Sequence, residues 1–342
     1  FNEPVTCMDT PEPEEDLHKS CQTEHYGREQ EVQTDPVPDL TSKGPLISIH
    51  RLKEDPETIY FYTGFQSFDH FMYLYQSLGP AVDQLNFQSR CMSTKDELFL
   101  CLIKLRLDKE EAELAILFRC SVTTVSRVFN TWLNFLYYQF KDLDLFLPKE
   151  TVDEYMPIDF KKKYPNTRII LDATEVKIEK PSNIKDQSAT WSTYKNCNTL
   201  KTMIGCSPRG FVTYVSPSYG GSCSDRQIIE ASNLLEKSQF CQGDSIMADR
   251  GIMVQDLFAA HDVTVNTPTT MRGKNQLPAE VVVKDRRIAS KRVHVERVIG
   301  LAKTYKILQN EINHSFTPKG GRIIFVCFVL SNFRTSIVGK YC

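Results

Sequence analysis

Three acidic residues in this chain stand where folding could gather their carboxylates at one place. Asp172 directly follows the apolar stretch 167–171, and Asp249 directly follows the apolar stretch 245–248. Glu296 belongs to a segment, residues 272–306, that holds ten basic and three acidic residues. Because ligand sites in open α/β sheets gather at the carboxyl ends of the strands, we expect the two aspartates to meet there. A basic helix would bring Glu296 to them.

Carboxylates gathered in this way need a counter-charge. Three of them at close range repel one another and cannot all ionise without it. A pair of Mg²⁺ or Mn²⁺ ions about 3.5–4 Å apart would supply the charge, activate a water or a 3′-hydroxyl and stabilise the leaving oxygen of a phosphoryl transfer. The structural alternative is that Glu296 only pairs with Arg292, four residues earlier on the same helix.

The second half of the chain must provide the strands and helices that position these acids. Short apolar stretches separated by turns predict strands, and Ser207-Pro208-Arg209-Gly210 is typical of a hairpin turn. The expected strands are 167–171, 200–206, 211–215, 245–248 and 263–265. Ser224 is expected to cap a helix that begins with Asp225, and residues 285–308 predict the long basic helix that carries Glu296.

The region ahead of the strands shows helical periodicity. Apolar spacing predicts helices at 65–75, at 94–107 with Ser93 as its cap, at about 109–118 and at 122–136. The last two flank a three-residue break, which is helix-turn-helix spacing. In that interpretation Thr123, Thr124 and Arg127 are candidates to contact DNA. The alternative is an ordinary helical hairpin, and the few basic residues on the second helix favour structure or weak contact.

Charge is distributed unevenly along the chain. Residues 1–50 hold eleven Asp/Glu against three Lys/Arg, whereas the whole chain holds 43 against 41. The first 45 residues also contain six prolines and almost no apolar periodicity, so we expect a disordered acidic linker there. The remaining body is mildly basic, which suits a polyanionic partner.

Cysteine usage and apolar runs exclude other classes of protein. The eleven cysteines form no C-x-x-C motif, so reduced thiols are expected and a structural zinc site is not. The longest apolar run, residues 323–330, is far shorter than the roughly 20 residues that span a bilayer. The chain begins at Phe1 rather than Met, so we expect it to be part of a longer protein.

Several blocks together resemble the DDE superfamily endonucleases of the PIF/Harbinger type. Residues 171–181 and 194–201 are similar to the family's first catalytic block, and residues 219–226 to its glycine-Ser-Asp block. Residues 247–251 and 292–308 resemble the second and third catalytic blocks, and residues 330–332 the closing helix. The likeness is strongest to the ISL2EU-like branch, whose members often carry an N-terminal THAP zinc finger.

This resemblance implies roles for individual residues. Asp172, Asp249 and Glu296 would be the catalytic, metal-binding triad, with two Mg²⁺ or Mn²⁺ ions, and Asp225 is a candidate fourth metal ligand. The alternative for Asp225 is an acid that stabilises the start of its helix. The candidates for DNA contact, besides those on the second helix of the helix-turn-helix, are Lys195, Lys201, Arg250, Arg292 and Arg297.

We therefore expect an α/β chain in which an all-α, helix-turn-helix-like domain precedes an RNase H-like catalytic domain, a mixed sheet flanked by helices. The expected boundaries are 1–50 for the linker, 60–145 for the helical domain and 160–340 for the nuclease domain. The resemblance implies a nuclear DNA transposase that acts as a homo-oligomer on transposon ends and target DNA. The alternatives are a transposase-derived protein that binds DNA without cutting it, and an enzyme of the same fold that acts on RNA or on DNA ends without strand transfer.

Overall fold

The structure is a computed structural model, and it describes residues 44–232, 234, 240–269, 278–334 and 338. Most of the expected acidic linker lies outside the described residues. Among the described residues, no helix is both long and apolar enough to cross a membrane. The eight cysteines of the described part of the chain are free thiols.

The first half of the described chain is helical. Its main helices are α1 (Pro56–Thr63), α2 (Phe68–Ser77), α3 (Thr94–Leu107), α4 (Glu111–Phe118) and α5 (Val122–Lys141). Helix α3 has the bounds and the Ser93 cap that the sequence predicted, and Arg119, with a φ of 50°, turns the chain between α4 and α5. The prediction missed α1, which Asp55 caps and Pro56 starts.

Two acids at the start of α3 are buried rather than exposed. The Asp96 carboxylate accepts a hydrogen bond of 2.9 Å from the backbone N–H of Ile49. The Glu97 carboxylate accepts one of 3.0 Å from the indole N–H of Trp132 on α5. Buried carboxylates are tolerated when such donors satisfy them. These two bonds tie the chain ahead of α1, α3 and α5 into one packed unit.

The second half is built on a mixed sheet. Its strands are β1 (Thr167–Lys177), β2 (Trp191–Ser192), β3 (Cys197–Cys206), β4 (Val212–Val215), β5 (Tyr219–Gly220), β6 (Ser245–Ala248) and β7 (Thr264–Asn266). The strand order along the sheet is β2-β3-β1-β6-β7, and β4 and β5 pair with β3. Strand β3 is antiparallel to β1, whereas β6 is parallel to β1 and to β7. This antiparallel-then-parallel sheet with flanking helices is the RNase H-like arrangement that the sequence predicted.

One detail of the predicted strands is wrong. Asp172 does not end its strand, because β1 continues to Lys177. The extension pairs with β3 from Ala173 opposite Met203 to Lys177 opposite Thr199. The polar residues of this stretch do not form a continuous apolar run, so hydrophobicity alone hid the longer strand. Asp249 does follow directly on the end of β6.

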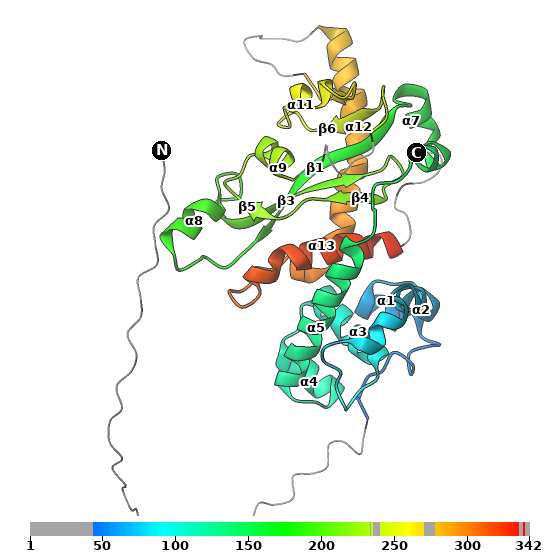
Figure 1. The fold of residues 1–342 in the computed structure, drawn as a ribbon, viewed down its shortest axis with the longest axis vertical. Helices are drawn as coiled ribbons and strands as arrows, with labels where there is room; N and C mark the ends of the chain where they lie inside the picture. Colours follow the sequence, from blue (N-terminus) through cyan, green and yellow to red (C-terminus); the bar gives the residue numbers. More distant parts are fainter. Residues whose placement is uncertain (1–43, 233, 235–239, 270–277, 335–337, 339–342) are drawn as a thin grey trace, which may run out of the picture. The chain divides into compact units, whose positions relative to one another are not determined.

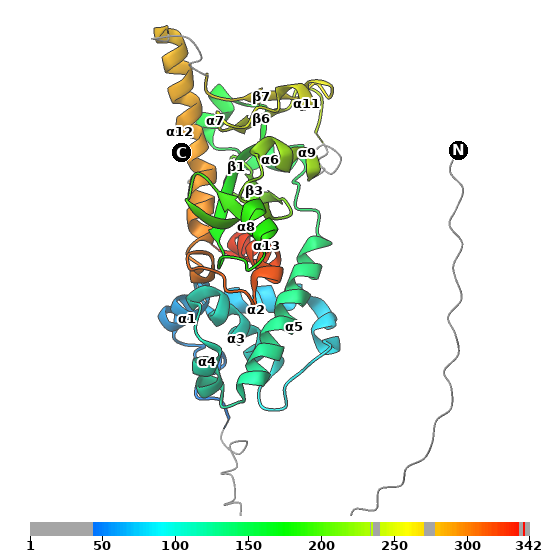
Figure 2. The same ribbon diagram turned by 90° about the vertical axis from the view of Figure 1, so that its left-hand side faces the viewer.

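Helices cover both faces of this sheet. The long helix α12 (Ala279–Ala302) and helix α13 (Gly320–Leu330) pack with Ile170, Ile204 and Met247 in one core cluster. Helices α9 (Asp225–Ala231) and α11 (Gln255–Ala259) contribute to a second cluster with Ile169, Leu171 and Ile246. Adjacent residues of β1 and of β6 therefore face opposite layers. Figure 1 shows α12 running along the sheet, and Figure 2 shows the same helix at one side of the molecule.

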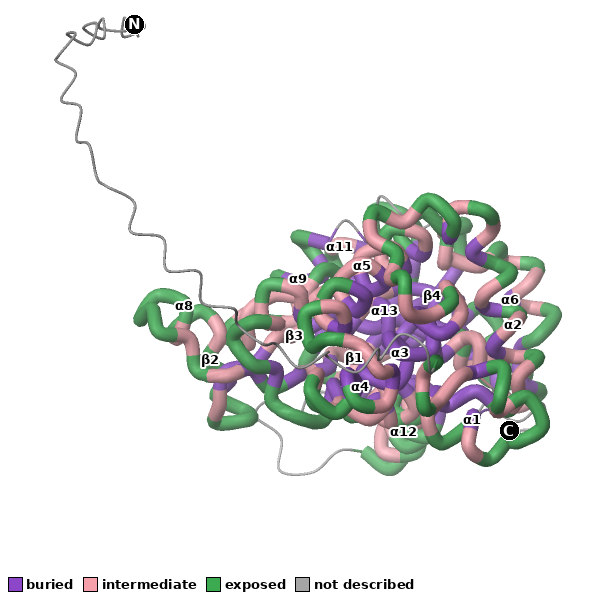
Figure 3. The backbone as a smooth tube through the Cα atoms, turned by 90° about the horizontal axis from the view of Figure 1, so that it is seen from below, coloured by how far each residue is buried: buried purple, intermediate pink, exposed green. Residues whose placement is uncertain are grey.

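Three short helices complete the second half: α6 (Lys149–Tyr155), α7 (Ile158–Lys163) and α8 (Ile184–Thr190). The basic helix begins six residues earlier than predicted and ends at Ala302, and residues 306–308 form a separate 3₁₀ turn. The first core cluster is continuous from α3 and α5 through α13 to the sheet. Figure 3 shows this buried zone around α13 and α3.

Candidate metal and DNA site

The three predicted acids converge on one guanidinium. Arg292 of α12 places its Nη1 2.9 Å from the Asp249 carboxylate, and its Nη2 3.6 Å from that of Asp172 and 3.8 Å from that of Glu296. Strand β1, the end of β6 and helix α12 each contribute one of these acids. The sequence prediction that they meet at one place therefore agrees with the geometry, and the Arg292–Glu296 pair that was its alternative is also present.

The cluster is closed on one side and open on the other. Arg292 and Asp172 are 11% and 22% exposed, whereas Asp249 and Glu296 are 47% and 53% exposed. Burial raises the pKa of Asp172 to about 6, the Arg292 guanidinium opposes this shift, and the Asp249 and Glu296 carboxylates add to it. One cation thus serves three carboxylates, which leaves the cluster with an excess of negative charge.

Contacts on other sides of α12 fix the direction of Arg292 and Glu296. Lys291 forms an ion pair with Asp159 of α7 and lies over the ring of Phe160, with its Nζ 5.3 Å from the ring centroid. The buried His294 ring shares a hydrogen bond of 2.8 Å between its Nδ1 and the carbonyl oxygen of Pro208. Burial lowers the pKa of His294, which favours the neutral ring. With these residues anchored, their helical neighbours Arg292 and Glu296 face Asp172 of β1 and Asp249 after β6.

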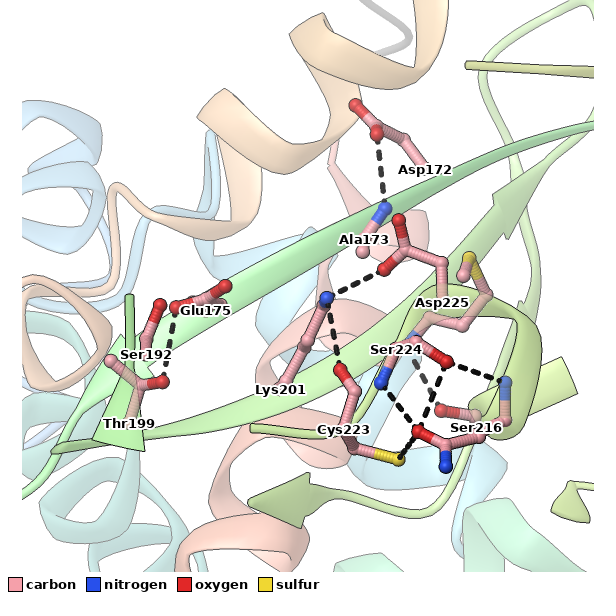
Figure 4. A network of polar contacts seen from close by, with 12 residues as sticks. Asp172, Ala173, Glu175, Ser192, Thr199, Lys201, Ser216, Cys223, Ser224 and Asp225 are labelled. Atoms are coloured by element: carbon pink, nitrogen blue, oxygen red, sulfur yellow. Dashed lines mark hydrogen bonds and ion pairs between the residues drawn. The ribbon is translucent and has the colours of Figure 1, made fainter. Parts of the chain in front are cut away.

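Asp225, the candidate fourth ligand, forms its ion pair with a lysine and not with Arg292. Its carboxylate is 2.7 Å from Nζ of Lys201, a residue of β3 that pairs with Glu175. Asp172 instead pairs with Ile204, so Lys201 and Asp172 point to opposite faces of the sheet. Figure 4 shows Asp172 rising toward α12 and the Lys201–Asp225 pair below β1. The geometry agrees better with the alternative interpretation, in which Asp225 occupies the first turn of α9 behind its Ser224 cap.

Lys201, a candidate for phosphate contact, also forms local contacts beside Asp225. Besides its ion pair with Asp225, its Nζ donates a hydrogen bond of 3.2 Å to the carbonyl oxygen of Cys223, and the side chain is 14% exposed. Glu175 also has a local partner, because its carboxylate accepts a hydrogen bond of 3.0 Å from Thr199. Lys201 and Glu175 therefore appear in a structural polar network beside the site (Figure 4).

Two lysines lie beside the acid cluster, toward the C-terminal end of α12. Lys303 caps the end of α12, and its Nζ donates a hydrogen bond of 3.3 Å to the backbone oxygen of Glu175. Burial lowers the pKa of Lys303; the positive charge of Lys195 adds to the shift, and the negative charge of Asp172 opposes it. Lys195 is exposed, and its Nζ is 4.8 Å from the ring centre of Tyr194, which is 81% exposed.

A hollow adjoins the cluster on the side of the α12 N-terminus. Its volume is about 550 Å³, and Asp249 and Arg292 form part of its wall. Arg250 and Arg286 also line it, and both are exposed residues. Arg297, another predicted DNA contact, is exposed on α12 one residue after Glu296. Cations therefore flank the acids on both sides, and such cations are suited to contact phosphate groups.

The helix-turn-helix candidates differ from one another. Thr123 is exposed at the start of α5. Thr124 is part of the helix cap, since its Oγ1 lies 2.9 Å from Oγ of Ser121. The Arg127 guanidinium covers the ring of Phe87 at 4.0 Å from its centre. Only Thr123 of these three presents a side chain without such a local contact in the described part of the chain, which suits weak rather than base-reading contact.

The donor set of the cluster has the chemistry of a site for a hard divalent cation. Three carboxylates carry six oxygen atoms, and Mg²⁺ and Mn²⁺ prefer such ligands. In the present arrangement, however, no group of three or more His, Cys, Asp or Glu side chains among the described residues stands close enough together to hold a metal ion. The Arg292 guanidinium lies between the acids. The three carboxylates are therefore suitable ligands for such a metal ion, but their present spacing accommodates the Arg292 guanidinium.

Two residues of this site were not identified as candidates from the sequence. Lys303 lies seven residues after Glu296, so both occupy the same face of α12, and this spacing was a usable signal. Arg286 was hidden among other arginines and lysines, because only the packing of α12 distinguishes those that face the hollow. Arg292 was expected to contact DNA or pair with Glu296, and its contacts with both aspartates depend on the fold.

Two models of known protein families match this chain. Residues 171–332 match the family described as DDE superfamily endonuclease, and residues 90–142 match the family described as helix-turn-helix of DDE superfamily endonuclease. The first match contains Asp172, Asp249, Arg292 and Glu296. No curated protein and no solved structure matches the chain significantly. The chain thus contains a helix-turn-helix region followed by a DDE nuclease domain.

Proposed function

We propose that this chain is a metal-dependent DNA transposase that cuts at transposon ends and joins the freed ends to target DNA. The observation that carries the proposal is the convergence of Asp172, Asp249 and Glu296 on one point between β1, β6 and α12. These acids are far apart in sequence, and they meet although their charges repel and only one guanidinium lies among them. Within the superfamily, the PIF/Harbinger branch is the assignment that the sequence blocks support.

In this proposal the three carboxylates hold the divalent cations. Bound Mg²⁺ or Mn²⁺ would supply the Lewis acid that lowers the pKa of an attacking water and stabilises the leaving oxygen. Asp172 supplies the enclosed ligand, held by the neighbouring strands, and Asp249 and Glu296 supply ligands open to the substrate. No covalent protein intermediate is needed, because phosphoryl transfer depends on positioning and on charge neutralisation.

The reaction has two phosphoryl transfers. In the first, the oxygen of water bonds to the phosphorus at the transposon end, the bond from phosphorus to the 3′-oxygen breaks, and a 3′-hydroxyl and a 5′-phosphate result. In the second, that 3′-oxygen attacks a phosphorus of target DNA, whose own 3′-oxygen leaves. Arg250 and Arg286 on one side of the acids, and Lys303 and Lys195 on the other, are placed to contact phosphates before and after the reacting one.

Cleavage of a labelled terminal-repeat duplex in the presence of Mg²⁺ tests this proposal. Asp249→Ala and Glu296→Gln should each lower the rate of cleavage by at least about 100-fold, the order of effect when transition-state stabilisation of several kcal/mol is lost. Glu280→Gln, which removes an acid from the first turn of the same helix, should cut at the wild-type rate. Unchanged cleavage in Asp249→Ala or Glu296→Gln would exclude the proposed roles.

A second candidate function follows from the Arg292 contacts. Because the guanidinium already partly neutralises the acids, a transposase-derived protein that binds DNA without cutting it is the alternative. The same assay separates the two: this alternative predicts tight binding of the duplex and no Mg²⁺-dependent product. Joining of labelled product to a plasmid separates a transposase from a nuclease of the same fold without strand transfer. A nuclear location and assembly into a homo-oligomer on DNA belong to the transposase proposal.

A further inference from the structure

Arg292 differs from the other cations around the site by the number of acids that it contacts. Its two terminal nitrogens reach all three carboxylates, within 2.9 to 3.8 Å. Its Nε is buried and makes no hydrogen bond within the described residues. An arginine that served only as a helix partner of Glu296 would not need to reach across to β1 and β6.

The position of the guanidinium is the one that a counter-ion of the acids would take. Without a cation among them, three carboxylates this close would repel one another, and burial would further penalise the charge on Asp172. With the guanidinium present, the acids stay together but do not form a group that could share a metal ion. A metal ion and the guanidinium would therefore compete for the same oxygen atoms.

We propose that Arg292 is a resident counter-cation, which holds the three acids in place until a divalent metal ion takes over their charge. The guanidinium then turns into the adjoining hollow, whose wall Arg292 already forms together with Arg250, Arg286 and the acids Asp249 and Asp285. There it would join these arginines in contacting a DNA phosphate. This inference rests on the proposed function, because it requires that the three acids bind metal.

This exchange predicts that removal of the Arg292 charge strengthens the binding of Mn²⁺. Removal of a residue that only supports the site would weaken it. Calorimetric titration of the chain with Mn²⁺, in the absence of DNA, should show tighter binding to Arg292→Gln than to wild type. We expect a gain of roughly fivefold to tenfold, because partly exposed ion pairs of modest strength no longer oppose the metal ion. Arg292→Lys keeps the charge and should bind Mn²⁺ nearly as the wild type does. Lys284→Gln removes an exposed charge from the same helix and should not alter Mn²⁺ affinity.

Thermal unfolding supplies a second readout. Without metal, Arg292→Gln should melt below the wild type, because its acids have lost their counter-charge. Saturating Mn²⁺ should raise its melting temperature more than that of the wild type, since a ligand stabilises the fold in proportion to its affinity. Equal or weaker Mn²⁺ binding by Arg292→Gln would overturn the exchange.

A measurement on the wild-type chain covers the case in which the variant does not fold. On addition of Mg²⁺, the NMR signal of the Arg292 Nε–H group should move, and in Asp249→Asn it should stay. A signal that does not move while calorimetry shows Mg²⁺ binding contradicts the exchange but leaves the proposed function intact. Absence of Mg²⁺ and Mn²⁺ binding in the wild type, with no cleavage, contradicts both.

Discussion

Strand β6 has a cluster of charges at each end, and the two clusters are built in opposite ways. Ahead of β6, the fully buried carboxylate of Asp244 lies 2.6 Å from Nζ of Lys149 and 3.5 Å from Nη1 of Arg168. It also accepts a hydrogen bond of 2.8 Å from the backbone N–H of Cys241. Beyond the other end of β6, a single cation, Arg292, serves three carboxylates.

The difference separates a cluster that stabilises the fold from one that is prepared for a ligand. In the Asp244 cluster two cations and a backbone donor satisfy one buried acid, and Arg168 in addition donates a hydrogen bond of 2.8 Å to the carbonyl oxygen of Leu147. In the Arg292 cluster the acids exceed the cations and two of them are open to solvent. Such an imbalance lowers stability and persists where binding or catalysis needs it.

The largest effect is expected in the Asp244 cluster. Asp244→Asn leaves Arg168 buried without its carboxylate, and breaking a buried pair in this way costs about 3–5 kcal/mol of unfolding free energy. Urea denaturation followed by circular dichroism measures this cost. A loss below about 1 kcal/mol, the value of an exposed pair, would remove the contrast between the two clusters.

The next effect is a dependence of stability on pH that arises from Asp172. Its pKa rises from 3.8 to about 6 in the folded chain, so the folded state binds the proton more tightly than the unfolded state does. This carboxyl therefore stabilises the fold fully below about pH 4, and the contribution is lost as the pH rises through 6. The full difference is roughly 3 kcal/mol. Asp172→Asn should lack this component when unfolding free energies of both proteins are compared between pH 4 and pH 7.

A smaller loss is expected for Lys149→Met. This lysine is 32% exposed, and Asp244 keeps Arg168 and the N–H of Cys241 after the substitution. Loss of one charge-assisted hydrogen bond should lower the unfolding free energy by about 1.5 kcal/mol, and urea denaturation would show it. A cost as large as that of Asp244→Asn would mean that Lys149 rather than Arg168 balances the buried acid.

The smallest effect, and the one of opposite sign, is expected for Asp249→Asn without metal. Arg292 retains two carboxylates, and one source of repulsion on Asp172 disappears. Stability should stay within about 1 kcal/mol of the wild type or increase. A loss of several kcal/mol would show that the three acids stabilise the fold rather than await a ligand.

Much of this fold could be predicted from local sequence. Ser93 and Ser224 are helix caps whose helices the structure places as expected, and the hairpin turn at residues 207–210 joins β3 to β4 as predicted. Caps and turns depend on the chemistry of a few neighbouring residues, so they can be recognised without the fold. The short helix α1 and the polar half of β1 lack a long apolar pattern and were missed.

The sequence predicted which acids belong to the candidate site. It did not predict how the side chains around them are arranged. Strand ends and a basic helix indicated that Asp172, Asp249 and Glu296 would meet. The position of Arg292 among them, and the engagement of Lys201 by Asp225 on the other face, depend on side-chain directions across β1, β3 and α12. Those directions follow from register and packing, which no single segment of sequence specifies.

Metal binding by the three acids can be observed in a crystal structure of the chain grown with Mn²⁺, with anomalous diffraction recorded at the manganese edge. We expect anomalous density between the carboxylates of Asp172, Asp249 and Glu296, with the Arg292 guanidinium turned away from them. Density elsewhere, with Arg292 still bound to all three acids at saturating Mn²⁺, would contradict this expectation.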